Sequence, residues 1–185
     1  MIRENLPWIG GAALAGCAVF FAEPVRLYML LGVMLFFPLL DRHWQLPPIP
    51  RTLPHIVTWT LLALASGTLA VAEPRHIDTA VSALLIAALP EEWFFRAYCM
   101  TQLEAGKRFN GVTANLTTSL MFSLIHGLSR DWTTALLVFT PSLFYGWLYQ
   151  RTRDLPLVVL GHALSNLVFG LFLAAPLRSV LGMSP

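Results

Sequence analysis

Residues 77–100 read IDTAVSALLIAALPEEWFFRAYCM, an apolar run that carries Glu91, Glu92 and Arg96 in its second half. As a helix, this run is long enough to cross the hydrocarbon core of a membrane, which takes roughly 17 to 25 residues. Backbone polar groups find no water in that core, so a spanning segment of this length must be helical. Charges inside a spanning helix are costly, and the three residues are therefore candidates for a functional site.

The composition of the whole chain supports this interpretation. Of its 185 residues, 56% are hydrophobic and 12% are charged, whereas about 25% of the residues in a typical soluble domain are charged. The excess of apolar surface excludes a disordered chain as well as a soluble domain. Twelve basic and ten acidic residues leave a net charge of only +2, so no basic face is available to bind nucleic acid.

Seven apolar runs are separated by polar or proline-containing stretches. They cover about residues 7–22, 25–40, 53–72, 77–100, 112–128, 132–150 and 155–175. The pattern predicts an all-α fold, a polytopic transmembrane helical bundle of about seven spans (six to eight), with the active site inside the bundle. No soluble segment is left over, so residues 1–185 are expected to form a single membrane domain. The first two runs are short, and they form either a hairpin that crosses fully or a pair that inserts only in part.

Basic residues predict the orientation of the bundle. If seven helices cross, the loops on the N-terminal side carry seven basic residues and the opposite loops carry four. The positive-inside rule then places the N-terminus in the cytoplasm. A compact chain without a targeting extension favours a bacterial cytoplasmic (inner) membrane. The N-terminal set is Arg3, Arg42, Arg51, Lys107, Arg108, Arg151 and Arg153, and the opposite set is Arg26, Arg75, Arg130 and Arg178.

The polar residues within the runs stand at helical spacing. Glu92 and Arg96 are four residues apart, which favours an ion pair on one face of a helix. Glu91 lies about 100° further around the same helix and would face another part of the bundle. The fifth run contains His126, and the seventh contains His162 and Asn166, again four residues apart. Three helices could therefore bring one carboxylate, two imidazoles and one carboxamide to a common point.

This set of groups suits hydrolysis. A carboxylate can deprotonate a water, an imidazole can hold that water or act as an acid, and an asparagine can donate to a developing oxyanion. A single histidine or asparagine within a span is more often a helix-packing residue bonded to a neighbouring carbonyl. The set is harder to explain as packing, because every member must be desolvated. Two other classes stay open, a proton-coupled transporter and a non-catalytic membrane scaffold. We find no internal repeat, which weighs against the transporter.

Three motifs carry a family resemblance. Glu91-Glu-Trp-Phe-Phe-Arg96 resembles the EExxxR motif, Phe122-Ser-Leu-Ile-His126 the FxxxH motif, and His162-Ala-Leu-Ser-Asn166 the HxxxN motif. In this order and spacing they resemble the CPBP (Abi) family of intramembrane proteases. That family includes CAAX prenyl endopeptidases and bacterial proteins tied to bacteriocin maturation, self-immunity and protein sorting. The resemblance covers about residues 77–170, the motif-bearing catalytic core, and selects none of these substrates.

The resemblance implies an enzyme that hydrolyses a peptide bond within the lipid bilayer. Its substrate would be a membrane-anchored protein or peptide, cut near the anchored, C-terminal tail. Glu91 would be the general base that activates water, and His126 would position that water. His162 and Asn166 would stabilise the oxyanion. The supporting residues would be Glu92, Arg96 and Phe122.

Metal dependence is left open by the residues. Glu91, His126 and His162 could supply three zinc ligands and leave a fourth place open. Against zinc, the HExxH motif is absent, and Asn166 suits an oxyanion donor better than a metal ligand. We therefore favour a mechanism without a cofactor, in which the carboxylate alone activates water.

Overall fold

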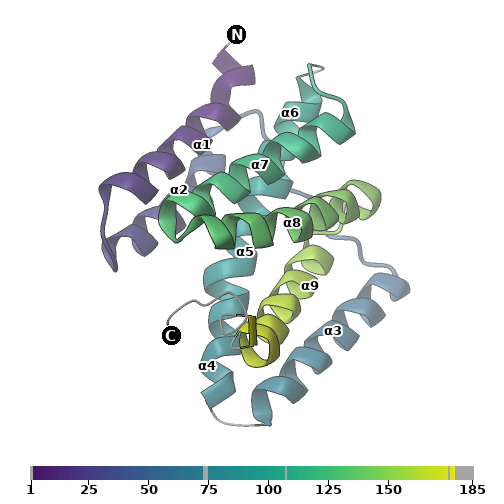
Figure 1. Ribbon diagram of the computed structural model, residues 1–185. Helices are drawn as coiled ribbons and strands as arrows, with labels where there is room; N and C mark the ends of the chain where they lie inside the picture. Colours follow the sequence, from purple (N-terminus) through teal and green to yellow (C-terminus); the bar gives the residue numbers. More distant parts are fainter. Residues whose placement is uncertain (1, 73–74, 107, 175, 178–185) are drawn as a thin grey trace. The chain divides into compact units, whose positions relative to one another are not determined.

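The computed structural model describes residues 2–72, 75–106, 108–174 and 176–177. Within these ranges all regular secondary structure is helical (Figure 1), which confirms the predicted all-α class. Three residues used in the predictions lie outside the described residues: Lys107 and Arg178 from the orientation count, and Ala175 at the end of the last predicted span.

The helices follow the seven apolar runs, and their ends differ from the predicted ends by a few residues. Five of the runs each form one helix: α1 (Ile2–Phe20), α2 (Val25–Leu40), α3 (Leu53–Val71), α7 (Gly111–Ser129) and α8 (Trp132–Thr152). The fourth run is a succession of segments: α4 (Arg75–Val81), η1 (Ser82–Ala88), α5 (Leu89–Glu92), η2 (Trp93–Met100) and α6 (Thr101–Ala105). The seventh run is α9 (Leu155–Val168) followed by η3 (Phe169–Leu173).

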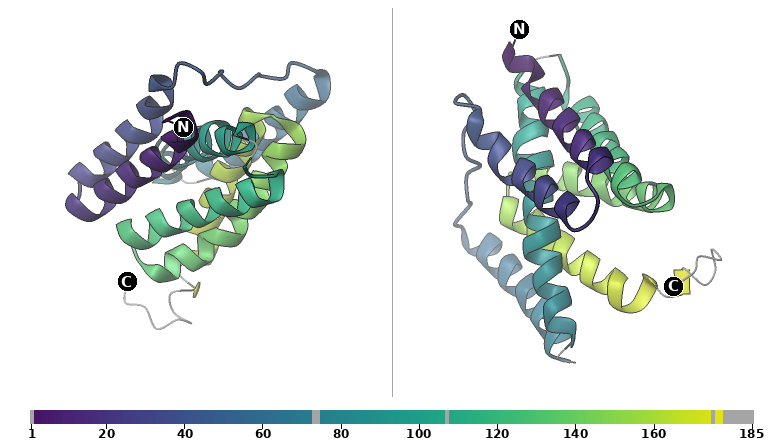
Figure 2. Two further views of the ribbon diagram at one scale, coloured as in Figure 1. Left: turned by 90° about the horizontal axis from the view of Figure 1, so that it is seen from above. Right: turned by 90° about the vertical axis from the view of Figure 1, so that its left-hand side faces the viewer.

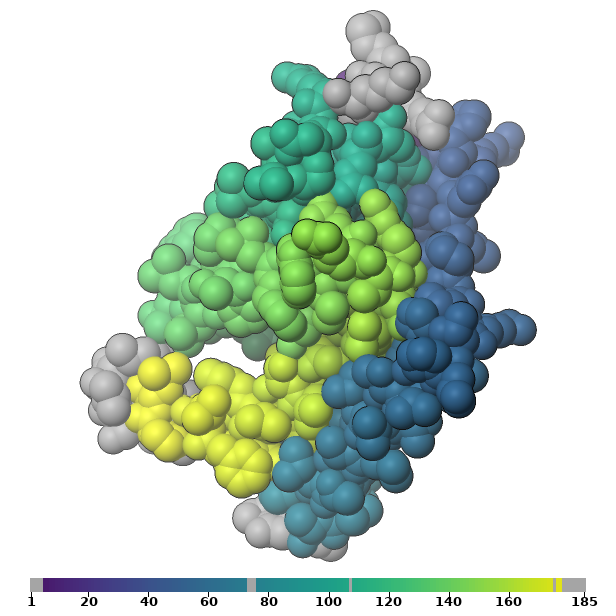
Figure 3. Space-filling view, turned by 90° about the vertical axis from the view of Figure 1, so that its right-hand side faces the viewer, coloured from purple at the N-terminus to yellow at the C-terminus, as the bar shows by residue number. Residues whose placement is uncertain are grey.

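Two stretches, Leu53–Val71 and Leu155–Leu173, are long and apolar enough to cross a membrane by themselves. Asn5–Phe20, the apolar part of α1, and α2 are shorter, and the remaining stretches carry polar residues that lower their hydropathy. On α3 the side chains lie at the surface, drawn in blue in Figure 3, and only Ala70 is buried. A bundle in which all seven stretches cross therefore stays a prediction.

The chain divides into two compact units, which we describe separately. The first contains the described residues of 1–48 and 90–155, and the second contains those of 49–89 and 156–185. A single membrane domain over residues 1–185 stays a prediction.

Two helical hairpins form most of the first unit. α1 and α2 lie side by side (Figure 2), and α7 packs along α8. The second hairpin turns sharply because Asp131 ends the loop and caps α8, its Oδ1 accepting a hydrogen bond of 2.8 Å from the Thr134 N–H. η2 packs against α2, α7 and α8, so this segment connects the two hairpins.

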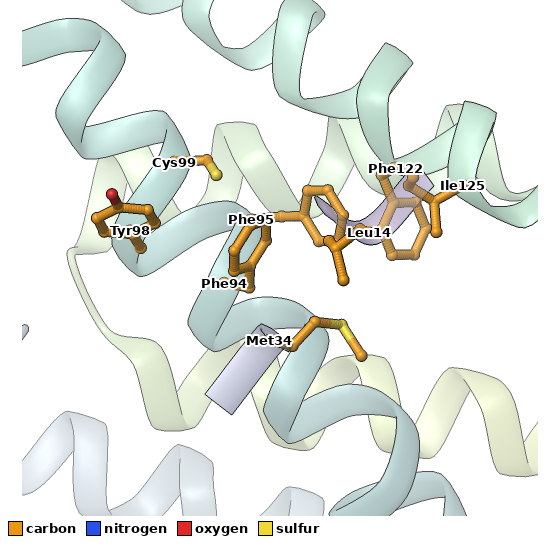
Figure 4. Packing of buried hydrophobic residues seen from close by; sticks show 8 residues of the cluster. All are labelled: Leu14, Met34, Phe94, Phe95, Tyr98, Cys99, Phe122 and Ile125. Carbon is orange, nitrogen blue, oxygen red and sulfur yellow. The ribbon is translucent and has the colours of Figure 1, made fainter. Parts of the chain in front are cut away.

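A core of aromatic and aliphatic side chains fixes η2 within the first unit (Figure 4). Phe95 of η2 meets Phe122 of α7 edge to face, with ring centroids 5.1 Å apart and an interplanar angle of 89°. Aromatic rings favour this geometry because a positive edge meets a negative face. The contact therefore sets how α7 is rotated against η2. The cluster consists of Leu14, Met34, Phe94, Phe95, Tyr98, Cys99, Phe122 and Ile125.

The helix is irregular around the two glutamates. α5 is a single α-helical turn between the π-helical segments η1 and η2. Pro90 lies in this turn and supplies no backbone N–H, so the regular hydrogen-bond ladder cannot continue through it. The chain instead forms the wider turns typical of π-helix, as in the bond from the Leu89 N–H to the Leu84 carbonyl. Such turns inside α-helices are frequent at functional sites.

In the second unit α3 pairs with α4, which continues into η1. His76 at the start of α4 donates from Nδ1 to the Leu69 carbonyl of α3, at 3.1 Å. This bond links the end of α3 to the start of α4. The same unit contains α9 with His162 and Asn166.

Candidate active site

Glu91 and His126 face each other in the first unit. Glu91 Oε1 lies 3.8 Å from His126 Nε2, and each side chain is 12% exposed. Glu91 is on α5 and His126 is in the last turn of α7, so helix packing rather than sequence spacing brings them together. The pair is shielded from solvent without being closed off.

The ring of His126 is held by its own helix. Its Nδ1 lies 3.0 Å from the backbone carbonyl of Phe122, one helical turn earlier. A carbonyl oxygen can only accept a hydrogen bond, so Nδ1 carries the hydrogen, and in the neutral ring Nε2 is then an acceptor. The Phe122 ring also lies against the imidazole, with centroids 4.3 Å apart. The four-residue spacing thus fixes both the tautomer of His126 and the plane of its ring.

Glu92 and Arg96 form the ion pair that their spacing predicts. Glu92 Oε2 lies 3.2 Å from Arg96 Nε, and the two side chains are 0% and 1% exposed. The angle at Nε is not that of a good hydrogen bond, so the contact is chiefly electrostatic. Breaking a buried pair by removing one partner typically costs about 3–5 kcal/mol, because the remaining charge is left without compensation.

The guanidinium of Arg96 also contacts the other two helices of the site. Its Cζ lies 5.4 Å from the centroid of the Phe122 ring on α7, at cation–π distance. Its Nη2 donates to Ser142 of α8, to Oγ at 2.9 Å and to the backbone carbonyl at 3.2 Å. Ser142 is not among the residues predicted from the sequence. The only signal was its place beside Pro141 in an apolar run, which does not show that it meets an arginine.

Five of the seven residues singled out in the sequence therefore lie together in the first unit. We call them the five-residue cluster. The cluster consists of Glu91, Glu92, Arg96, Phe122 and His126. The other two, His162 and Asn166, stand one turn apart on α9 in the second unit. That they complete a site with the cluster stays a proposal.

Two further features bear on ligands. Within either unit, no three described His, Cys, Asp or Glu side chains gather closely enough to hold a metal ion. A cleft of about 460 Å³ opens in the first unit beside η2, α6 and α8, and its lining includes Trp44, Thr101, Tyr149 and Arg153. None of the seven candidate site residues lines this cleft.

Comparison with known proteins assigns the family. The family model of the type II CAAX prenyl endopeptidase Rce1-like proteins matches residues 74–168, just over half of the 185-residue chain. The chain belongs to this Rce1-like family. The three motifs resemble the same group of proteins, and the match confirms that prediction. A comparison with curated proteins and a comparison with solved structures each gave no match.

Membership has direct consequences for the chain. Rce1-like proteins are membrane-embedded peptidases, so this chain is a peptidase of the membrane. The matched region begins just before α4 and ends with α9, and it therefore contains both glutamates, both motif histidines and Asn166. α1 and α2 lie outside the Rce1-like match, although they pack against α7 and η2.

Proposed function

We propose that the chain is an intramembrane endopeptidase in which Glu91 activates a water held between its carboxylate and His126. The observation that carries the proposal is the 3.8 Å separation of Glu91 Oε1 and His126 Nε2. With Nδ1 donating to the Phe122 carbonyl, Nε2 and the carboxylate are both acceptors. A water about 2.8 Å from each would donate one hydrogen to each atom.

The proposed reaction uses that water as the nucleophile. Its oxygen attacks the carbonyl carbon of the scissile peptide bond while Glu91 takes its proton. His162 and Asn166 of α9 would donate to the oxygen of the tetrahedral intermediate, where negative charge develops. The C–N bond then breaks, and the protonated Glu91 returns the proton to the leaving amine. The products are a carboxylic acid and an amine, and Glu91 is again ionised.

The rest of the cluster would support this pair. Glu92 compensates the buried charge of Arg96, and Arg96 lies against the Phe122 ring. Phe122 in turn holds the imidazole of His126 through its carbonyl and its ring. Glu92, Arg96 and Phe122 would therefore act on catalysis through His126, without touching the substrate.

We infer a substrate with a membrane anchor and an unwound segment beside it. A peptide bond within a helix is not accessible to a nucleophile, so the cleaved segment should be a disordered or small-residue tail. The name of the family points to CAAX-type tails near a prenyl anchor. Sorting tails and bacteriocin precursors would satisfy the same requirements. The basic residues of the loops support a cytoplasmic N-terminus, and we propose a bacterial inner membrane as the location.

The proposal is tested by co-expressing membrane-anchored candidate tails with the wild type or with Glu91→Gln and measuring the cleaved mass. Glu91→Gln should lower the cleavage rate by roughly 10²- to 10⁴-fold, the usual contribution of a general base. Glu23→Gln is a matched control, because that carboxylate is 62% exposed and lies at the turn before α2. Equal cleavage by the wild type and Glu91→Gln would refute the role of Glu91. A pH-driven flux lost in Glu91→Gln, with no cleavage of any tail, would indicate a transporter instead.

The same assay separates the metal-free mechanism from its zinc-dependent alternative. Glu91 and His126 could each serve as a zinc ligand, with His162 as the third. We expect cleavage to continue after prolonged dialysis against a chelator. Loss of cleavage that added zinc restores would contradict the metal-free mechanism and leave the peptidase assignment intact.

A further inference from the structure

Several residues contact the buried Arg96, and among them Ser142 lies outside the three motifs. It is on α8, it is 1% exposed, and both its hydroxyl and its carbonyl accept from Arg96 Nη2. Glu92 meets the same guanidinium from α5, and Phe122 meets it from α7. Arg96 is therefore held from three elements at once, and Ser142 is the contribution of α8.

The guanidinium has few other partners. Among the described residues its Nη1 has no hydrogen-bond acceptor, and its Nε meets Glu92 only at an ion-pair distance and a poor angle. Among the described residues, the Ser142 hydroxyl makes the shortest polar contact with this guanidinium, at 2.9 Å. Because the site is 0–1% exposed, bulk water cannot simply take the place of a lost hydroxyl.

We propose that Ser142 is a positioning residue for the peptidase reaction and acts through Arg96 and Phe122 on His126. This inference rests on the proposed function, because it assigns His126 to the reaction. Ser142 fixes the plane of the guanidinium that lies over one part of the Phe122 ring. That ring contacts the imidazole at 4.3 Å, so a rotated guanidinium displaces the ring and changes the distance from Nε2 to Glu91.

The variant Ser142→Ala tests the proposal, and Ser119→Ala is its matched control. Ser119 is on α7, it is 0% exposed, and its hydroxyl donates to Asn115 Oδ1 at 3.2 Å, without contacting Arg96. Both variants remove one buried hydroxyl from a helix, and alanine favours the helix in both cases. We expect Ser142→Ala to lower kcat roughly 10-fold with an unchanged KM, and Ser119→Ala to change neither by more than about twofold. Equal kcat values for the two variants would overturn the proposal.

A double-mutant cycle tests whether the lower kcat of Ser142→Ala depends on Arg96. Lysine keeps the charge but lacks the planar fork that meets both oxygens of Ser142. In an Arg96→Lys background, Ser142→Ala should therefore lower kcat by less than about twofold. A full 10-fold loss in that background would show that Ser142 acts by another route.

A measurement independent of cleavage keeps this inference distinct from the proposed function. The imidazole resonances of His126, assigned by their loss in His126→Gln, are recorded by NMR in detergent micelles. They should shift in Ser142→Ala and stay in place in Ser119→Ala. Unshifted resonances in Ser142→Ala would refute the positioning role even if cleavage is observed. If the wild type cleaves no tail but the resonances shift, the proposed function fails and the coupling of Ser142 to His126 stands.

Discussion

The seam between α7 and α8 offers a direct test of the packing that holds the site. At Gly146 of α8 an added Cβ would lie 2.6 Å from Asn115 Cγ and closer still to its Oδ1. Asn115 cannot simply move aside, because its Nδ2 donates to the Leu143 carbonyl at 3.0 Å and its Oδ1 accepts from Ser119. Gly146→Ala must therefore separate the helices or break the hydrogen bonds of Asn115.

The expected loss follows from three terms. Alanine is favoured over glycine within a helix by about 1 kcal/mol. Overpacking a tight contact costs about 1–3 kcal/mol, and each lost hydrogen bond of Asn115 costs about 1 kcal/mol. Gly146→Ala should therefore reduce the free energy of unfolding by about 2 kcal/mol.

The control is Gly11→Ala on α1. The Cβ added there would meet the terminal methyl of Met121. This is the end of a flexible side chain that can turn away, so Gly11→Ala should be at least as stable as the wild type. Unfolding of both variants in detergent by added SDS, followed by circular dichroism, measures the difference.

A second background makes the test stricter. Asn115→Ala removes the side chain that obstructs the new Cβ, and the helix propensity of alanine then acts alone. In that background Gly146→Ala should raise the free energy of unfolding, the reverse of its effect in the wild type. Equal unfolding of Gly146→Ala and Gly11→Ala, or the same sign in both backgrounds, would refute the close packing described for these two helices.

Three further predictions concern the five-residue cluster and the N-terminal cap of α8. Arg96→Met leaves Glu92 buried without its cation and should lower the free energy of unfolding by about 3–5 kcal/mol in the same assay. The second substitution Glu92→Gln removes the uncompensated charge and should restore part of the lost free energy of unfolding. Phe122→Leu keeps the backbone carbonyl but removes the ring, so kcat should fall about 10-fold at unchanged KM in the cleavage assay. Hydrogen bonds from the backbone N–H and the hydroxyl of Thr134 hold the pKa of Asp131 below its ordinary value of 3.8. The Asp131 cap therefore stabilises α8 fully above about pH 4, and this stabilisation is lost as the pH falls through the lowered pKa. The variant Asp131→Asn should not show this loss. Melting temperatures of the wild type and the variant between about pH 2 and pH 6 measure the difference.

The helices could be predicted from the sequence because polar and proline residues separate the apolar runs clearly. The predicted run 25–40 coincides with α2, and the run 53–72 differs from α3 by one residue. The π-helical segments could not be predicted, since they depend on which carbonyl each N–H selects. Pro90 signals only that the regular ladder is interrupted near the glutamates.

Within the site, contacts along one helix could be predicted and contacts between helices could not. The spacing of Glu92 and Arg96 fixes their encounter through helical geometry alone. The approach of Glu91 to His126 needs the packing of η2, which continues from α5, against α7, and no local spacing gives that packing. Ser142 was missed for a related reason. Serine in a helix usually bonds to its own backbone, and only the tertiary fold shows that this one meets Arg96.

The two adjacent glutamates show how one helix can give the same side chain two different roles. Neighbouring residues on a helix point about 100° apart, so Glu91 and Glu92 enter different surroundings. Glu92 is fully buried against Arg96, where its charge compensates that of the guanidinium. Glu91 is 12% exposed, and its Oε1 lies 3.8 Å from Nε2 of the imidazole, close enough for one water beside the pair to bond to both atoms. Exchanging the two environments would require turning the helix by about 100°, which would break the Phe95–Phe122 contact and the buried cluster around it. The EExxxR spacing therefore supplies both a proposed catalytic base and the charge that stabilises its arginine neighbour.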